Sequence, residues 1–248
     1  MKTVKPNTPI QYVMEKTEFC GLDFLVDERV LIPRPETEML VETVFEMLHN
    51  TQRTISNTKI LDLGTGSGCI AIALMVRLCS PSILSKTSRG GRVEGLTKKI
   101  SDCTMIASDL SEGALDVARQ NARIHGVAGR IDFAKSDLFE SVKGAFDIIV
   151  SNPPYVARTD FPNLQKEVLK EPFMAFDGGQ DGLDMYRRIV NKAAEYMNNG
   201  AFIVMEMGFG QRKGIIEMFK KAGGFKVVSE KKDYNDIDRV IVAQWISS

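Results

Sequence analysis

The sequence predicts an α/β protein built on a seven-stranded, doubly wound sheet, and three observations lead to that fold class. First, short runs rich in β-branched and aromatic residues alternate with helical patterns from Lys59 onward, as in sheets of mainly parallel strands. Second, a glycine-rich loop joins the first of these strands to the first helix. Third, the tail carries two strand-like runs with a polar connection, which we expect to form an antiparallel pair at one edge.

The order of the elements follows from their patterns. Strands are expected in "KILDLG", "TMIASD", "RIDFAKSD", "FDIIVSN" and "AFIVMEM", and twice more in "FKVVSEKKDYNDIDRVIVAQWI". Helices are expected in "GCIAIALMVRLC", "SEGALDVARQNARIHG" and "LDMYRRIVNKAAEYM". In the second of these helices, Ser111 is the expected N-cap and Gly126 the stop signal.

Two regions lie outside this alternation. Residues 1–36 include "TEFCGLDFLVDERVLIPRP", which alternates and turns like a small β-hairpin ahead of the sheet. The main domain is therefore expected over residues 37–248. Residues 80–102 lack strong periodicity and hold five basic residues against two acidic ones. We interpret them as a mobile insertion whose charges are solvated.

The composition excludes several classes of protein. Lys plus Arg equals Asp plus Glu, 32 against 32, so no overall field favours nucleic acid or an anionic membrane. No apolar run approaches the roughly 20 residues that span a bilayer, and the N-terminus lacks the apolar stretch of a secretory signal. The four cysteines form no C-x-x-C pair and there are two histidines. We therefore predict a cytoplasmic protein with reduced thiols and no metal site.

The glycine-rich loop "GTGSG" is the first candidate binding site. Glycines between a strand and a helix let the backbone turn sharply and approach a ligand closely. A dinucleotide fingerprint needs a third glycine where this chain has Cys69, and a phosphate-binding P-loop needs a lysine that is absent. A tight turn with no ligand is the alternative. The candidate cofactor-binding residues are Gly64, Thr65, Gly66, Ser67 and Gly68.

Acidic residues follow the next two predicted strands. Asp109 ends "TMIASD", where a carboxylate can accept hydrogen bonds from both ribose hydroxyls; it could equally stabilise a helix N-terminus. Asp137 follows the third strand and could accept from an adenine amino group, with Leu138 against the ring. Asp137 could also be a simple loop-initiating residue. An acidic residue placed to bind a ribose, beside a glycine loop without the features that bind a pyrophosphate, favours a nucleoside cofactor that lacks phosphates. S-adenosyl-L-methionine fits that description.

The strongest local signal is "NPPY", which ends the fourth predicted strand beside the first. Asn152 offers a side-chain carbonyl and Pro153 a backbone carbonyl, and two convergent acceptors can hold an NH₂ group. They would also stabilise the positive charge that develops when a weakly nucleophilic nitrogen attacks a methyl group. Tyr155 can lie flat against a planar substrate group. As plain structure, Asn-Pro is a common turn initiator.

With these motifs in place, the sequence resembles the protein-(glutamine-N5) methyltransferases of the HemK/PrmC family, which modify peptide-chain release factors. The matching segments are "EFCGLDFLVDERVLIPRPETEMLVE", "ILDLGTGSGCIAIAL", "ASDLSEGALDVARQNA", "VSNPPYV", "EPFMAFDGGQDGLDMYRRI" and "DRVIVA". "NPPY" alone is shared with adenine and cytosine amino methyltransferases, whereas its combination with "LIPRPETE" and "GGQDGL" is more specific.

The resemblance implies a class I methyltransferase fold with a Rossmann-like sheet, and S-adenosyl-L-methionine bound near the glycine loop, Asp109, Leu138 and Asn152. It implies a release factor as the partner, whose Gly-Gly-Gln glutamine is held by the catalytic residues Asn152, Pro153 and Tyr155. Pro154 belongs to the same substrate-binding loop. The segment "IPRPETE" is expected at the cofactor and substrate entrance, which adds the candidates Arg34, Glu36 and Thr37. Family members usually carry a helical domain ahead of the hairpin, and residues 1–17 are too few to form one.

Three rival functions follow from the same residues. An amino methyltransferase acting on adenine in RNA or DNA would use the same acceptors, and it should surround Asn152 with basic charge. A non-catalytic binding subunit would not need Asn152, Tyr155 and the glycine loop. A nicotinamide dehydrogenase is disfavoured by the glycine spacing and by the lack of a histidine near the cleft.

Overall fold

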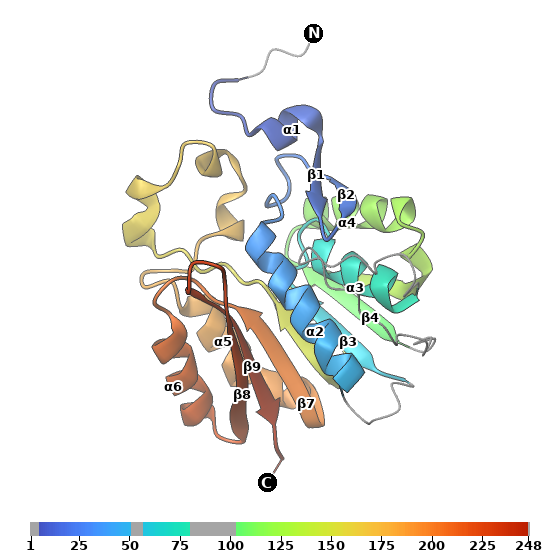
Figure 1. The fold of residues 1–248 in the computed structure, drawn as a ribbon, viewed down its shortest axis with the longest axis vertical. Coiled ribbons are helices and arrows are strands. Elements are labelled where there is room, and N and C mark those ends of the chain that lie inside the picture. Colours follow the sequence, from blue (N-terminus) through green and yellow to red (C-terminus); the bar gives the residue numbers. More distant parts are fainter. Residues whose placement is uncertain (1–4, 51–56, 80–102, 248) are drawn as a thin grey trace.

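The protein's sheet has the predicted doubly wound order. The structure is a computed structural model that describes residues 5–50, 57–79 and 103–247. Within these residues, seven strands pair in the order β5-β4-β3-β6-β7-β9-β8 (Figure 1). Their bounds are β3 Lys59–Leu63, β4 Thr104–Asp109, β5 Ile131–Lys135, β6 Phe146–Ser151, β7 Met197–Glu206, β8 Phe225–Lys232 and β9 Asp238–Trp245. The first five strands in this order are parallel, and β9 runs antiparallel to both neighbours.

Helices cover both faces of the sheet. On one face lie α2 (Glu38–Asn50), α3 (Cys69–Cys79) and α4 (Glu112–Ile124), and on the other lie α5 (Asp184–Ala193) and α6 (Arg212–Ala222) (Figure 1). Adjacent β3 residues are buried on opposite faces, with Ile60 packing against the α2–α3 side and Leu61 against the α5–α6 side. This two-sided burial explains why the strands read as continuous apolar runs.

Local signals set the helix ends. The Ser111 hydroxyl accepts a hydrogen bond from the Ala114 N–H at 3.2 Å, which confirms Ser111 as the N-cap of α4. The chain leaves that helix through Gly126, whose φ is +69°. Helix α6 was missed by the sequence analysis, because Gly214 weakens its pattern. A Cβ at Gly214 would lie 3.0 Å from Leu183 Cδ1, so the glycine allows close packing beside α5.

The predicted N-terminal hairpin is confirmed. A short helix, α1 (Ile10–Met14), precedes strands β1 (Lys16–Phe19) and β2 (Leu22–Leu25), which pair antiparallel. Positive φ values at Cys20 and Gly21 make the two-residue turn. The hairpin is tied to α2 by a 2.7 Å hydrogen bond from the Cys20 N–H to Glu38.

The buried Asn121 side chain of α4 ties the same hairpin to the glycine loop. Its Nδ2 donates to the Leu25 carbonyl at 3.0 Å and to the Ser67 carbonyl at 2.9 Å, and its Oδ1 accepts from the Leu25 N–H at 2.8 Å. Hairpin, helix and loop therefore meet at one side chain.

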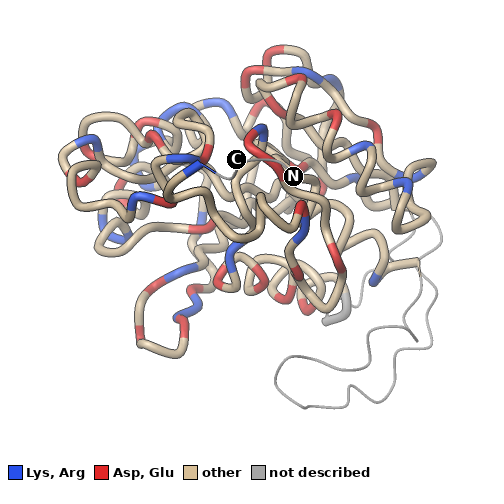
Figure 2. Tube along the Cα trace, turned by 90° about the horizontal axis from the view of Figure 1, so that it is seen from above, with Lys and Arg blue, Asp and Glu red and all other residues tan. Residues whose placement is uncertain are grey.

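Charge is spread evenly over the described chain, with acidic and basic positions interspersed in Figure 2. The predicted insertion at 80–102 lies outside the described residues, and the domain boundary at residue 36 stays a prediction. None of the helices in the described ranges is both long and apolar enough to cross a membrane.

Candidate active site

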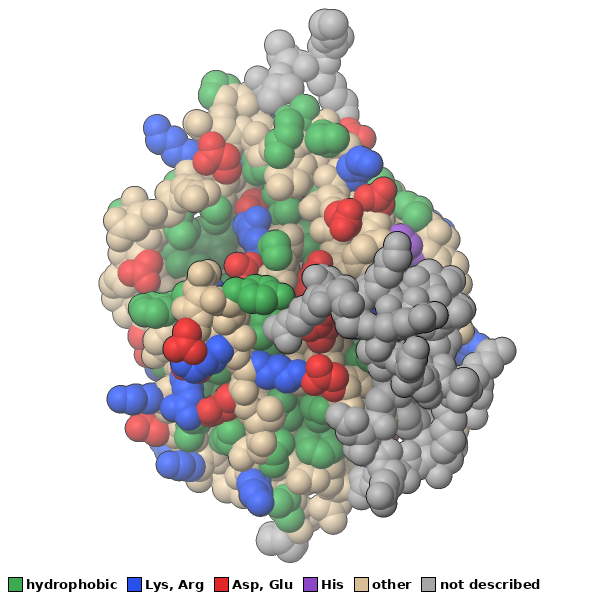
Figure 3. Space-filling model, in the orientation of Figure 1, with side chains coloured by type: hydrophobic (Ala, Val, Ile, Leu, Met, Phe, Trp, Pro, Cys, Tyr) green, Lys and Arg blue, Asp and Glu red, His purple; other side chains and the backbone are tan. Residues whose placement is uncertain are grey.

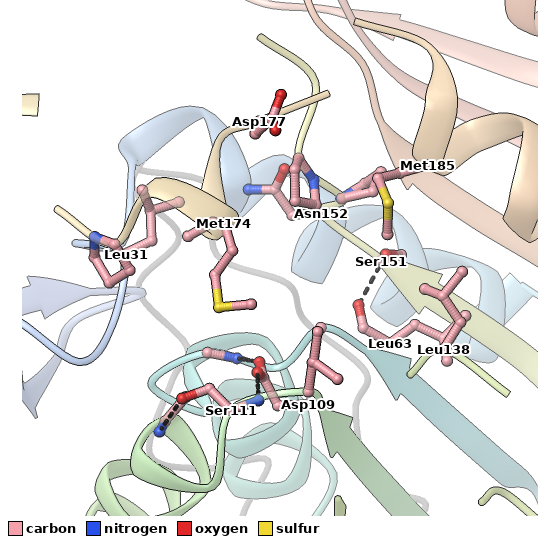
Figure 4. Close-up of a pocket in the computed structure, with 18 of the residues that line it drawn as sticks. Leu31, Leu63, Asp109, Ser111, Leu138, Ser151, Asn152, Met174, Asp177 and Met185 are labelled. Atoms are coloured by element: carbon pink, nitrogen blue, oxygen red, sulfur yellow. Dashed lines mark hydrogen bonds between the residues drawn. The ribbon is translucent and has the colours of Figure 1, made fainter. Parts of the chain in front are cut away.

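A cavity of about 320 Å³ opens at the carboxyl ends of β3, β4, β5 and β6. This is where open α/β sheets bind their ligands, at the point where the strand order reverses. The loops after these four strands form its floor, and the wall is made by residues 29–31 and 172–175 together with Ala114, Asp177, Met185 and Arg188. Figure 4 shows Asn152 and Asp109 at opposite ends of the cavity, with Met174 and Leu138 on either side between them.

The glycine loop divides into two parts with different surroundings. Gly64 and Gly66 line the cavity with φ values of +73° and +55°, and a Cβ at either position would meet no atom within 4 Å. A Cβ at Gly68 would lie 2.9 Å from Ile72 Cδ1 and 3.1 Å from Ala118 Cβ, so this glycine allows α3 and α4 to pack closely. Bare backbone therefore faces the cavity at the first two glycines only.

The other loop residues lie beneath the cavity wall. The Thr65 hydroxyl donates to Asp62 Oδ2 at 2.7 Å, and Thr65, Ser67 and Asp62 are all buried. Among the described residues, the buried side-chain atoms without a hydrogen-bond partner are Asp62 Oδ1 and Ser67 Oγ. Burial raises the pKa of Asp62 to about 7, against the opposing hydrogen bond from Thr65. Neither Asp62 nor Ser67 lines the cavity, so these two atoms are enclosed within the loop.

Asp109 joins the glycine loop to helix α4. Its Oδ2 accepts from the Gly66 N–H at 2.8 Å and its Oδ1 from the Ser111 N–H at 2.9 Å. Burial raises the pKa of Asp109, while these backbone N–H groups lower it. Each carboxylate oxygen keeps a second lone pair, and the residue lines the cavity, so the helix-entrance role and the ribose-binding role are compatible here.

The third-strand candidates also line the cavity. Asp137 pairs with Arg188 at 2.8 Å, which holds its carboxylate at the cavity wall. Leu138 has a left-handed φ of +49°, a conformation that costs a non-glycine residue free energy. Its side chain lies beside Leu63 in Figure 4. An adenine has an amino group at its edge that a carboxylate can accept from and a flat face that an apolar side chain can cover. A carboxylate beside an apolar side chain therefore suits an adenine ring.

Asn152 is connected to the interior by a chain of hydrogen bonds. Its Nδ2 donates to Thr37 Oγ1 at 3.1 Å, and the Thr37 hydroxyl donates to Glu206 Oε2 at 2.7 Å. The Tyr155 hydroxyl donates to the other oxygen, Glu206 Oε1, at 3.2 Å. Thr37 and Glu206 are buried, so Thr37 lies behind Asn152, and it is not one of the cavity-lining residues.

Two acceptors remain for a ligand. No described residue donates to the Asn152 side-chain carbonyl or to the Pro153 backbone carbonyl. Asn152, Pro153 and Pro154 all line the cavity.

Tyr155 does not line the cavity, since its hydroxyl bonds to Glu206 and its backbone is enclosed by glycines. A Cβ at Gly178 would lie 2.7 Å from the Tyr155 carbonyl carbon.

Arg34 and Glu36 are also outside the cavity lining. Arg34 pairs with the buried Glu171 at 2.5 Å, and the other oxygen of Glu171 accepts from the Ile32 N–H at 2.9 Å. These bonds connect the "IPRPETE" segment to the cavity wall at residues 172–175. Their roles in substrate binding stay predictions.

Two further residues were missed by the sequence analysis. Glu206 is the last residue of β7, within the apolar run "AFIVMEM", and an acid at the carboxyl end of a strand is the signal that identified Asp109. Gln211, at the start of α6, donates to the Tyr155 carbonyl at 2.8 Å. A lone glutamine in a helical pattern gives no comparable signal.

The cavity mouth is apolar, and the cavity lining carries acidic as well as basic side chains. Phe173 and Met174, 56% and 52% exposed, form one lip. The Phe173 ring contacts Phe161 and Phe176, with centroids 5.4 and 5.6 Å away. Among described residues, the cavity lining includes the arginines Arg29 and Arg188 and the aspartates Asp109, Asp137 and Asp177. On the described part of the face in Figure 3, blue and red side chains are likewise mixed.

Comparisons with known proteins agree with this geometry. The family model described as "RMKL-like, methyltransferase domain" matches residues 38–176. A release factor glutamine methyltransferase of Geobacter sulfurreducens is 39% identical over 94% of this chain and 72% of its own length. One from Streptococcus pneumoniae is 38% identical over 94% of the chain and 74% of its own length.

Solved structures share the fold at low sequence identity. A methyltransferase from Pyrococcus furiosus has a TM-score of 0.57 at 18% identity, covering 92% of this chain and 90% of that one. The hMettl16 catalytic domain in complex with MAT2A 3'UTR hairpin 1 has a TM-score of 0.65 at 14% identity, covering 92% of this chain and 76% of that one. These likenesses confirm the class I methyltransferase fold.

Proposed function

This chain belongs to the release factor glutamine methyltransferase family, and from that premise we propose that it methylates the side-chain amide nitrogen of a glutamine in a peptide-chain release factor, with S-adenosyl-L-methionine as the methyl donor. The observation that carries the proposal is the pair of open acceptors, the Asn152 side-chain carbonyl and the Pro153 carbonyl, at the cavity wall. A release-factor substrate would place the reaction in the cytoplasm, where translation takes place.

The cavity residues suit this cofactor. Gly64 and Gly66 present bare backbone, Asp109 would accept from the ribose hydroxyls, and Asp137 with Leu138 would hold the adenine. Like the positions of Thr65, Ser67 and Gly68, these assignments are part of the proposal. When bound, S-adenosyl-L-methionine supplies a methyl group on a positively charged sulfur, which an amide nitrogen can take up with loss of one proton.

Asn152 and Pro153 supply the catalysis that the chain itself contributes. An amide nitrogen is a weak nucleophile because its lone pair is delocalised into the carbonyl group. Two acceptors aimed at its hydrogens hold the nitrogen in one position and stabilise the positive charge that develops during attack. The proline ring limits the orientation of the backbone at Pro153, so this acceptor is preorganised.

The surface around the cavity favours a protein substrate over a nucleic acid. A nucleic-acid enzyme needs basic side chains to contact phosphates, whereas Arg29 and Arg188 are both paired with aspartates. The exposed Phe173 and Met174 offer an apolar contact that a protein loop can cover. Adenine methylation is therefore not favoured, although its exocyclic amine would fit the same two acceptors.

The test is methyl transfer from labelled S-adenosyl-L-methionine to a purified release factor with its Gly-Gly-Gln glutamine intact or replaced by alanine. We expect label on the intact protein alone. Asn152→Ala should lower turnover by about 100-fold or more, the range for losing a transition-state hydrogen bond, while cofactor binding survives at least in part. The matched control is Asn235→Ala, an exposed asparagine in the β8–β9 connection. Label on RNA, or on the alanine variant of the release factor as well as on the intact protein, would contradict the proposal.

A further inference from the structure

The buried Glu206 lies two hydrogen bonds away from the acceptor oxygen at the cavity. Glu206 Oε2 accepts from the Thr37 hydroxyl at 2.7 Å, and Thr37 Oγ1 accepts from Asn152 Nδ2 at 3.1 Å. Glu206 is 1% exposed and Thr37 is 2% exposed, so both bonds are shielded from water. The bonds connect the end of β7, the start of α2 and the end of β6.

The direction of each bond follows from the groups present. An ionised carboxylate only accepts hydrogen bonds, so the Thr37 hydroxyl must give its single proton to Glu206. Thr37 Oγ1 then faces Asn152 with a lone pair and needs a donor, which the Asn152 NH₂ group provides. With its NH₂ group engaged, Asn152 must present its carbonyl to the cavity.

We propose that Glu206, acting through the Thr37 hydroxyl, fixes the orientation of the Asn152 side-chain amide so that its carbonyl and not its NH₂ group faces the substrate nitrogen. This inference rests on the proposed function and makes Glu206 and Thr37 positioning residues. If the Asn152 side-chain amide were turned by 180°, its NH₂ group would face the N–H groups of the substrate amide. The substrate amide would then lose one of its two acceptors. Glu206 also accepts from the Tyr155 hydroxyl, so the same carboxylate supports both ends of the "NPPY" loop.

The surroundings of Glu206 make the orientation sensitive to protonation. The pKa of Glu206 is raised to about 7, mainly by burial and to a smaller extent by Glu36, against the lowering effects of Thr37, Tyr155 and Arg239. Arg239 is itself paired with Asp233 at 2.8 Å. Two further titratable groups are near Glu206: Tyr186, whose hydroxyl donates to the Glu206 backbone carbonyl at 2.8 Å, and Cys69.

Protonation would remove the directional constraint. A neutral Glu206 could donate to Thr37, and the Thr37 hydroxyl could then donate to the Asn152 carbonyl. The amide would turn and the acceptor would be lost. Turnover should therefore rise with pH as Glu206 ionises.

Three variants test this orientation with the full chain, labelled S-adenosyl-L-methionine and a release factor. Thr37→Ser keeps the hydroxyl, and we expect at least half of wild-type kcat. Thr37→Val keeps the shape and removes the hydroxyl, and Glu206→Gln supplies an NH₂ group that can donate to Thr37. Both should lower kcat about tenfold or more, with cofactor affinity within twofold of wild type. Glu217→Gln, on the exposed surface of α6, is the matched control.

The pH profile separates positioning from simple structural support. Wild type and Thr37→Ser should share a step in kcat near the pKa of Glu206, and Glu206→Gln should lack it. If Glu206→Gln does not fold, Thr37→Val and Thr37→Ser decide the question alone. Wild-type kcat in Thr37→Val, or an unchanged pH step in Glu206→Gln, would overturn the inference. No transfer by the wild type would instead reject the proposed function.

Discussion

The Gln211 side chain is hydrogen-bonded to the backbone of Tyr155. Its Nε2 donates to the Tyr155 carbonyl at 2.8 Å and to the Gly182 carbonyl at 3.0 Å, while its Oε1 accepts from the Gly208 N–H at 2.9 Å. A Cβ at Gly182 would lie 2.5 Å from the Tyr155 oxygen, so the glycine permits this approach. The end of the "NPPY" loop is thus fixed by hydrogen bonds from a side chain to its backbone, and Gln211 is not one of the residues that line the cavity.

Gln211→Ala should therefore damage the loop without touching the cavity. It leaves two carbonyls and one N–H without partners, and we expect the free energy of unfolding to fall by about 1–3 kcal/mol. Turnover should fall as well, because Asn152 and Pro153 lose their support. Urea unfolding measures the first effect and methyl transfer the second. Gln120→Ala, on the exposed side of α4, is the control and should change neither.

Asp109→Asn should weaken cofactor binding. Its Oδ1 and Oδ2 each accept a backbone N–H, and an asparagine would turn its NH₂ group toward one of those donors. We expect the Kd for S-adenosyl-L-methionine to rise by the equivalent of about 1–3 kcal/mol, measured by calorimetry. Asp132→Asn, an exposed residue on β5, is the control. An unchanged Kd in Asp109→Asn would leave Asp109 with the helix-entrance role alone.

Alanine at Gly68 and alanine at Gly66, two glycines of the same loop, should affect stability and cofactor affinity to different extents. Gly68→Ala brings a methyl group 2.9 Å from Ile72 and 3.1 Å from Ala118, so we expect a clear loss of Tm from overpacking. Gly66→Ala meets no neighbour but projects from backbone that lines the cavity. It should cost only the backbone strain of about 1–2 kcal/mol while lowering cofactor affinity. Equal effects of the two variants on Tm and on affinity would contradict this division.

Asp62 should make stability depend on pH. Its pKa is raised by burial from 3.8 to about 7, so between these values the folded state holds a proton that the unfolded chain has released. The contribution of this proton to the free energy of unfolding is fully present below about pH 4 and is lost as the pH rises through about 7. The free energy of unfolding in urea should fall less between pH 5 and pH 8 in Asp62→Asn than in wild type. Asp116→Asn, exposed on α4, should behave as wild type does.

The sequence was sufficient for the sheet and for the residues at its edge, because periodicity and strand ends are local signals. "KILDLG", "TMIASD" and "FDIIVSN" become β3, β4 and β6, and Asp109 and Asn152 follow from their places at strand ends. Helix α6 was missed because Gly214, in its first turn, is explained only once Leu183 packs beside it.

The network behind the site could not be predicted in the same way. Glu206 meets Thr37 across 169 positions of the chain, and only the fold brings them together. Arg34 illustrates the reverse case, since a motif suggested the cavity wall while its guanidinium pairs with Glu171. A motif identifies which residues belong to a site, but it does not show which of them face the ligand.

The three hydrogen bonds of Asn121 also have a consequence for how the molecule opens. An isolated two-stranded hairpin is marginally stable in water, yet β2 is bonded to a side chain that also holds the Ser67 carbonyl. Separating the hairpin from α4 would break contacts to the glycine loop at the same time. Hairpin and loop should therefore unfold as one cooperative unit, and the Leu25 amide should exchange its hydrogen as slowly as those of the central strands.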